Sequence, residues 1–207
     1  DVPSYPFELS YCKKCGLVQQ SKLIEEIVIK KVYTAQYYNC PSPIISGMGV
    51  SEIEKFLNYF LKCKNKPGKI LEIACFDGYL LEELKKLKWD VYGCDPCPVT
   101  DIAINRLGRE RIRKAFFKDV TYPKNYFDEI IFRNLLVAIY NPNSFLKTVR
   151  SCLKENGKIF IDVPNLKEII KLGGFGLFFH QHITYFTIKT LSILLSKLKE
   201  KINKSLD

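Results

Sequence analysis

The stretch Leu71–Leu81, LEIACFDGYLL, joins a short apolar run to the start of a helix through Asp77-Gly78. A stretch of this shape is typical of a strand, a turn and a helix N-terminus that face a nucleotide-like ligand. Loops that cradle a pyrophosphate usually contain several glycines, but Ala74 and Phe76 occupy those positions here. Gly78 can take a backbone conformation closed to other residues, and we expect it to let the chain approach a ligand closely.

Strand-like and helix-like segments alternate from Ser51 onward. We expect helices at 51–61, 78–88, 99–108, around 145–153 and from 187, and strands at 69–74, 90–95, near 115–117, at 126–132 and at 158–163. This alternation predicts βαβ units, and so a Rossmann-like, doubly wound α/β fold with a mostly parallel sheet and helices on both faces. Ligands of such sheets bind beyond the carboxyl ends of the strands.

Local signals predict where helices begin and which faces are buried. Ser51 and Glu54 are spaced as a capping box, and Asn141-Pro142 predicts the start of the helix that follows. The apolar positions expected to face the core recur at helical spacing: Ile53, Phe56, Leu57, Phe60 and Leu61; Leu80, Leu81, Leu84 and Leu87; Ile188, Leu191, Leu195 and Leu198.

Three carboxylates lie within, at the end of, or after predicted strands. Glu72 lies in the first strand, Asp95 ends the second 23 residues later, and Asp119 follows the third. A carboxylate at the position of Asp95 can accept both ribose hydroxyls. Three carboxylates disfavour a pyrophosphate, which prefers backbone amides and cations. They suit a ligand with a ribose and a positive charge, and S-adenosyl-L-methionine has both.

Composition and charge limit the other classes of function. The 207 residues are 47% hydrophobic, enough for one main core, and contain no apolar run of membrane-spanning length. The formal charge of +10 is spread over lysine-rich helix surfaces, which makes a nucleic-acid partner less favoured than a small-molecule substrate. Eight cysteines without a signal-peptide pattern favour a reducing, cytoplasmic location.

From about Lys69 to Asn165 the chain resembles a class I S-adenosylmethionine-dependent methyltransferase. The resemblance rests on LEIACFDGYLL, on Asp95, and on the later segments FDEIIFRNLL and FLKTVRSCLKENGKIFIDVPN. It implies that Asp119 reaches the adenine and that Asn134 lies beneath the methionine part of the donor. The donor-binding residues expected on this basis are Glu72, Ala74, Gly78, Tyr79, Asp95, Pro96, Asp119, Val120 and Asn134.

More of the chain is similar to one branch, the sugar C-methyltransferases. The segments YPFELSYCKKCGLVQ, YYNCPS, LEIACFDGYLL and FFHQHITYFT occur in the order seen in that family. The similarity implies C-methylation of a nucleotide-linked keto-deoxysugar beside its carbonyl. It implies that His182 is the base, with His180 the other histidine of the loop, and that Tyr37 helps to hold the substrate. Tyr33 and Tyr38 compete with Tyr37 for that role, and either histidine can instead serve only to hold its loop.

Three positions depart from the family pattern. Phe179 and Gln181 stand where Tyr and Glu are common around the H-x-H, and Ala138 replaces a frequent His. These changes remove groups that would orient the sugar or tune the base. The alternative interpretation is therefore a relative that binds the methyl donor without catalysis; a nucleic-acid methyltransferase is a more distant one.

Cys12, Cys15 and Gly16 form a C-x-x-C-G knuckle of the kind that binds zinc. A structural zinc needs four ligands and two are evident, so zinc is bound incompletely, recruits Cys40 or Cys63, or is lost. Cys94 and Cys97 are interpreted as small residues beside the ribose site. We expect a Cys-containing segment at 1–45 and a methyltransferase core at 46–207. Relative to the resembling family, both appear truncated.

Overall fold

The computed structural model describes residues 5–35, 42–64 and 66–203, with side chains through residue 196. Tyr37, Tyr38 and Cys40 therefore lie outside the described residues. The chain forms two compact units, one built from residues up to 29, 134–148 and those from 162, and the other from 30–133 and 149–161. The predicted domain boundary between residues 45 and 46 stays a prediction.

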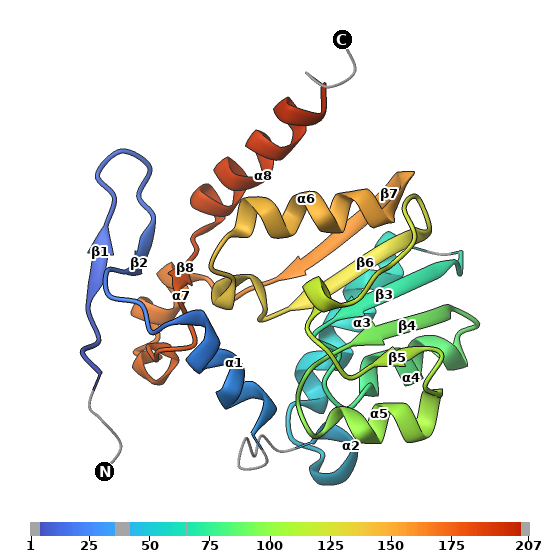
Figure 1. The fold of residues 1–207 in the computed structure, drawn as a ribbon. Helices are drawn as coiled ribbons and strands as arrows, with labels where there is room; N and C mark the ends of the chain where they lie inside the picture. Colours follow the sequence, from blue (N-terminus) through green and yellow to red (C-terminus); the bar gives the residue numbers. More distant parts are fainter. Residues whose placement is uncertain (1–4, 36–41, 65, 204–207) are drawn as a thin grey trace. The chain divides into compact units, whose positions relative to one another are not determined.

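The second unit contains a five-stranded sheet (Figure 1). Its strands are β3 (Lys69–Ile73), β4 (Asp90–Cys94), β5 (Ile112–Arg113), β6 (Phe127–Arg133) and β7 (Leu153–Asp162), in the order β5-β4-β3-β6-β7. The pairings of β3 with β4, β3 with β6 and β4 with β5 are parallel. The chain first moves outward from β3 to β5 and then returns to the other side of β3, which confirms the predicted Rossmann-like fold and places the reversal of strand order between β3 and β6.

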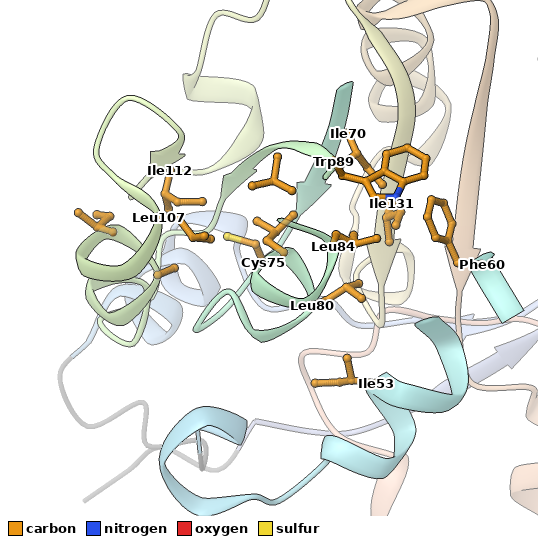
Figure 2. Close-up of a cluster of buried hydrophobic side chains, with 14 residues drawn as sticks. Ile53, Phe60, Ile70, Cys75, Leu80, Leu84, Trp89, Leu107, Ile112 and Ile131 are labelled. Carbon is orange, nitrogen blue, oxygen red and sulfur yellow. The ribbon is translucent and has the colours of Figure 1, made fainter. Parts of the chain in front are cut away.

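Helices α3 (Val50–Cys63), α4 (Tyr79–Lys86) and α5 (Thr100–Leu107) supply side chains to a core on one face of this sheet. Figure 2 shows this core, where Phe60 and Leu84 lie close to the sheet residues Ile70 and Ile131, all four fully buried. Burial of each such side chain is worth about 1.5–3 kcal/mol. The predicted inward positions Leu80, Leu81 and Leu84 are confirmed, because all three are buried.

Three local predictions for this unit are wrong. The strand expected near 115–117 lies at Ile112–Arg113, and Phe117–Asp119 form the 3₁₀ helix η1. Leu87 is 43% exposed, because α4 ends at Lys86 and Leu87 is its C-cap. Ser51 does not cap its helix, since α3 begins at Val50 behind Gly49, which has φ 79°.

Two short helices precede α3 in the chain. α1 (Glu26–Thr34) spans the change from one unit to the other, and α2 (Pro43–Ser46) belongs to the second unit. Ser42 caps α2 by accepting a hydrogen bond from the Ile45 N–H.

The first unit contains an antiparallel sheet of β1 (Leu9–Tyr11), β2 (Val18–Gln20) and β8 (Thr184–Tyr185). Its other elements are η2 (Leu136–Ala138), α7 (Leu166–Lys171), η3 (Phe175–Leu177) and α8 (Ile188–Asn203), while α6 (Pro142–Cys152) begins in it, as Asn141-Pro142 predicted. The expected burial of Ile188 is wrong, because this residue is 75% exposed at the start of α8. Among the described residues no helix is both long and apolar enough to cross a membrane.

Candidate active site

The loop after β3 is a strained backbone segment. Ala74 has φ 63° and Phe76 φ 52°, in the left-handed region that residues with a side chain rarely adopt. The loop is fixed to the end of the neighbouring strand β4, because the Ala74 N–H donates a hydrogen bond to the Cys94 carbonyl at 2.8 Å. Strain of about 1–3 kcal/mol per residue persists only where the surroundings enforce it, and it concentrates at ligand sites.

Gly78 ends this loop with φ 80° and is the N-cap of α4. A Cβ added there would lie 2.8 Å from the Ala103 Cβ of α5. The glycine is therefore required by the close packing of α4 on α5. The approach of the backbone to a ligand at Gly78 stays a prediction.

Asp77 anchors the loop to α2. Its Oδ2 accepts hydrogen bonds from the Ser42 hydroxyl at 2.6 Å and from the Ile44 N–H at 2.8 Å, and its Oδ1 accepts from the Tyr79 N–H at 3.0 Å. The Asp77 carboxylate is thus engaged by protein groups on both oxygens. Its function is to hold the loop shape, which the sequence interpretation did not assign.

Asp95 follows β4 and lies against the same loop. Its Oδ2 accepts from the Phe76 N–H at 3.1 Å and its Oδ1 from the Cys97 N–H at 2.9 Å. Burial raises the pKa of Asp95, while its hydrogen bonds with Cys97 and Phe76 act in the opposite direction. Each carboxylate oxygen keeps a second lone pair, so Asp95 can still accept hydroxyl groups of a ligand.

Glu72 is buried on β3, and its Oε2 has no hydrogen-bond partner among the described residues. Burial raises the pKa of Glu72 to about 8, against the opposing field of Arg133, and the nearby charges of Asp77 and Asp95 add to the rise. Arg133, the last residue of β6, likewise has its Nε and one terminal nitrogen buried and unpartnered within the described chain. A carboxylate and a guanidinium with unmet hydrogen bonds suit the ammonium and carboxylate of an amino-acid ligand.

The remaining predicted donor residues occupy varied positions. Tyr79 is the first residue of α4, and Pro96 follows Asp95; both are half-buried. Asp119 is an exposed residue of η1, with Val120 directly after it. Asn134 is exposed, has φ 52° and follows β6 as the first residue of a segment of the other unit.

The H-x-H loop belongs to the first unit and holds His182 in a buried position. The Nδ1 of His182 lies 3.0 Å from the Leu177 carbonyl oxygen. A carbonyl oxygen only accepts, so Nδ1 carries the hydrogen of the neutral ring and Nε2 keeps the lone pair. Burial lowers the pKa of His182, with the Leu177 carbonyl opposing. The ring is thus a neutral base near pH 7.

The other residues singled out around this loop have different surroundings. His180 is packed edge-on by Tyr5 and Phe7, at centroid distances of 5.9 and 5.4 Å. The Phe179 ring lies 4.0 Å from the His182 ring, between centroids, so an aromatic ring contacts His182 at the position where a tyrosine was expected from the resemblance. Ala138 ends η2 and is half-buried, and Gln181 is half-buried as well.

The segment from Cys12 to Leu17 forms a closed turn. Gly16 has φ 82°, and the turn is closed by hydrogen bonds from the Gly16 N–H to the Cys12 carbonyl and from the Cys12 N–H to the Leu17 carbonyl, both 2.8 Å. Within the described residues no group of three or more potential metal ligands occurs. The two thiols of this turn supply only half of the ligands of a four-coordinate structural zinc.

The second C-x-x-C has the character expected of ordinary core residues. Cys94 and Cys97 are buried, and burial raises the pKa of each thiol to about 12. The Cys97 sulfur contacts the Thr100 hydroxyl at 3.3 Å. Thiols so resistant to ionisation are poor redox groups, which supports their interpretation as packing residues.

Comparison with known families is consistent with this geometry. Residues 49–198 match a family model described as a methyltransferase domain. The chain belongs to this methyltransferase family. The match spans the βαβ core and the His182 loop, so this chain carries a class I S-adenosylmethionine-dependent methyltransferase domain.

Individual relatives add detail. The chain is 24% identical over 199 residues to C-methyltransferase NovU of Streptomyces niveus, and the alignment covers 92% of this chain and 45% of NovU. The chain therefore spans about half the length of this relative.

Solved structures share the fold at low identity. The plantazolicin methyltransferase BpumL, in complex with a triazolic desmethylPZN analog and SAH, has a TM-score of 0.63 at 19% identity, with 84% of this chain and 74% of that chain covered. A SAM-dependent methyltransferase from Archaeoglobus fulgidus has a TM-score of 0.60 at 16% identity, with coverage of 84% and 74%.

Proposed function

We propose that this protein transfers a methyl group from S-adenosyl-L-methionine to a ring carbon beside the carbonyl of a nucleotide-linked keto-deoxysugar. The observation that carries the proposal is the state of His182, a buried, neutral imidazole whose free lone pair is on Nε2. The similarity to a C-methyltransferase supports it, because methylation at carbon beside a carbonyl requires a base.

The donor would bind at the carboxyl end of β3 and β4. The Asp95 carboxylate is placed to accept the ribose hydroxyls, since both of its oxygens keep a lone pair. Glu72 and Arg133 have buried polar atoms without partners in the described chain, and they would receive the ammonium and carboxylate of the methionine part. When bound, the donor supplies an electrophilic methyl group on its sulfonium.

His182 would carry out the proton transfer. Its Nε2 takes the proton from the C–H beside the carbonyl, and the electron pair of that bond forms an enolate. The enolate carbon would bond to the donor methyl, the electron pair of the carbon–sulfur bond would pass to sulfur, and S-adenosylhomocysteine would be the product. The imidazolium returns its proton to solvent, and the Leu177 carbonyl stabilises the ring by its contact with Nδ1.

Proton exchange separates the two halves of this reaction. We expect the wild-type protein to exchange the carbon-bound proton of a nucleotide-linked keto-deoxysugar in D₂O, followed by NMR, with S-adenosylhomocysteine present. A His182→Ala variant should lose about 10²–10⁴-fold of the exchange rate and of methyl transfer, because the general base is gone.

His180→Ala is the matched control for this experiment, since it removes the other imidazole of the same loop. It should retain exchange within a few-fold. The reverse result, loss in His180→Ala with retention in His182→Ala, would contradict the assignment of the base. Binding of S-adenosylhomocysteine without exchange or transfer on the keto-sugars tested would identify a relative that only binds the donor.

A further inference from the structure

Gln20 is a buried residue at the end of β2 whose side chain reaches the histidine loop. Its amide nitrogen Nε2 lies 2.7 Å from the His182 carbonyl, 3.0 Å from the His180 carbonyl and 3.3 Å from the Phe179 carbonyl. Gln20 and His182 are 162 positions apart in the sequence. One amide group therefore contacts three carbonyls of the segment that carries the proposed base.

The backbone fixes the same segment on both sides of His182. The Gln20 N–H donates to the Ile183 carbonyl at 2.8 Å, and the Ile183 N–H donates to the Val137 carbonyl at 2.7 Å. The His182 N–H closes a turn on the Phe179 carbonyl at 3.0 Å. The side chain of Gln20 is thus the one described group that also ties down the carbonyl of His182 itself.

The orientation of the Gln20 amide follows from its neighbours. Carbonyl oxygens only accept, so the NH₂ end must face them. An NH₂ group has two hydrogens, so the two shorter contacts are full hydrogen bonds and the Phe179 carbonyl shares one of them. Gln20 is only 2% exposed, and its Oε1 is buried without a partner in the described chain. A buried amide that leaves its acceptor unused is committed to donating.

We propose that Gln20 is a positioning residue that fixes the His180–His182 loop, so that His182 keeps its hydrogen on Nδ1 and presents Nε2 to the substrate. This inference rests on the proposed function for the role of His182, but its structural part can be tested without catalysis. Without the amide, the His180 and His182 carbonyls lose their donor, and the turn must move to find water. The Nδ1 contact with Leu177 would then loosen.

The test is NMR of protein labelled with ¹⁵N in histidine. The chain has two histidines, and a His180→Ala variant identifies the signals of His182. We expect the wild-type ring to show one tautomer, with the hydrogen on Nδ1, and a pKa below the ordinary value. Gln20→Met keeps the length and removes both hydrogen-bonding groups. It should give a mixture of tautomers and move the pKa of His182 up toward its ordinary value.

The surroundings of the ring simplify this titration. Tyr185 is the titratable ring near His182, at 6.2 Å between centroids, and burial raises its pKa to about 12, so it stays neutral. Phe179 and Leu177 carry no charge. A change in the His182 titration therefore reports the position of the ring and its contact with Leu177.

Gln19→Met is the matched control, because it makes the same change at the exposed neighbour on the same strand. It should leave the His182 signals unchanged. Methyl transfer should fall about 10–100-fold in kcat for Gln20→Met, as expected for a misplaced base, with the Kd for S-adenosylhomocysteine within twofold of the wild type.

If Gln20→Met does not fold, Gln20→Asn keeps an amide but withdraws it by one methylene, and the same measurement is made there. Folded variants with an unchanged His182 spectrum would overturn the positioning role, and so would unfolding of both, which would make Gln20 a purely structural residue. These outcomes are independent of whether His182→Ala loses proton exchange, so failure of the proposed function is recognised separately.

Discussion

The donor edge of the five-stranded sheet and the histidine loop are built in opposite ways. At the donor edge, Glu72, Asp77 and Asp95 lie within 24 consecutive residues of one βαβ unit, and Asp77 and Asp95 are bound by backbone groups of their own or adjacent loops. The histidine loop instead depends on Gln20, which comes from a strand 162 residues away. The hydrogen bonds of Asp77 and Asp95 reach at most 35 positions along the chain, to Ser42, whereas the second arrangement forms only after distant strands pair.

This difference concerns preorganisation as well as folding. At the donor edge, Glu72 and Arg133 have buried polar atoms without a partner in the described chain, which we propose a bound donor would supply. In the histidine loop the backbone N–H groups of His182 and Ile183 are hydrogen-bonded, and the ring of His182 contacts the Leu177 carbonyl. One region has buried polar atoms left for a ligand in our proposal, and the other holds a neutral imidazole ring in one orientation.

The largest expected effect on stability concerns the rigidity of the donor edge. Gly78→Ala should lower the free energy of unfolding by about 2–5 kcal/mol, because a side chain at φ 80° is strained and its Cβ would collide with Ala103. Urea denaturation followed by circular dichroism measures this loss. Gly47→Ala is the control, since Gly47 has φ 71° but nothing within 4 Å of the added Cβ, and it should cost only about 1–2 kcal/mol. Equal losses in the two variants would show that packing of α4 on α5 does not define the loop.

A smaller expected effect on stability concerns the raised pKa of Glu72 at the donor edge. The pKa of Glu72 is raised to about 8 in the folded chain, so between its ordinary value and 8 the folded state holds a proton that the unfolded state has released. The contribution of Glu72 to stability therefore falls as pH rises through this window and levels off above 8. Glu72→Gln should remove that dependence and raise the free energy of unfolding by about 2 kcal/mol at pH 7.

The control for this pH experiment is Glu52→Gln, at an exposed position in the first turn of α3. It should change stability by less than about 0.5 kcal/mol at any pH. A wild-type stability that stays flat from pH 5 to 8, with Glu72→Gln no more stable than wild type, would mean that Glu72 is ionised and paired in the free protein. The donor edge would then not be waiting for a cationic ligand.

The sequence predicts the parts that depend on short-range pattern. The strand–loop–helix at 71–81, the buried leucines of α4, and the position of Asp95 after its strand all follow from periodicity and turn residues. β5 was misplaced because two residues, Ile112–Arg113, are too few to show an alternation. Leu87 was misplaced because helical spacing gives the direction of a side chain but not the end of the helix.

Other features depend on contacts that no local pattern reveals. The bond between Ser42 and Asp77 joins residues 35 positions apart, and the carbonyl contacts of Gln20 span about 160. Gln20 in the sequence is one of two adjacent glutamines, and nothing in the pattern separates the buried one from the exposed one except strand alternation. The sequence does not predict a role for Arg133, because a basic residue at a strand end is usually exposed. Its buried nitrogens are evident only in the structure.

Calorimetric titration with S-adenosylhomocysteine tests the central claim most directly, namely that Asp95 is part of a nucleoside site at the carboxyl edge of the sheet. The wild-type protein and the control Asp101→Ala, at an exposed position of α5, should bind with the same Kd. Asp95→Ala should bind about 100-fold more weakly, because two charge-assisted hydrogen bonds to the ribose are lost. Equal affinity in Asp95→Ala and wild type would contradict the account.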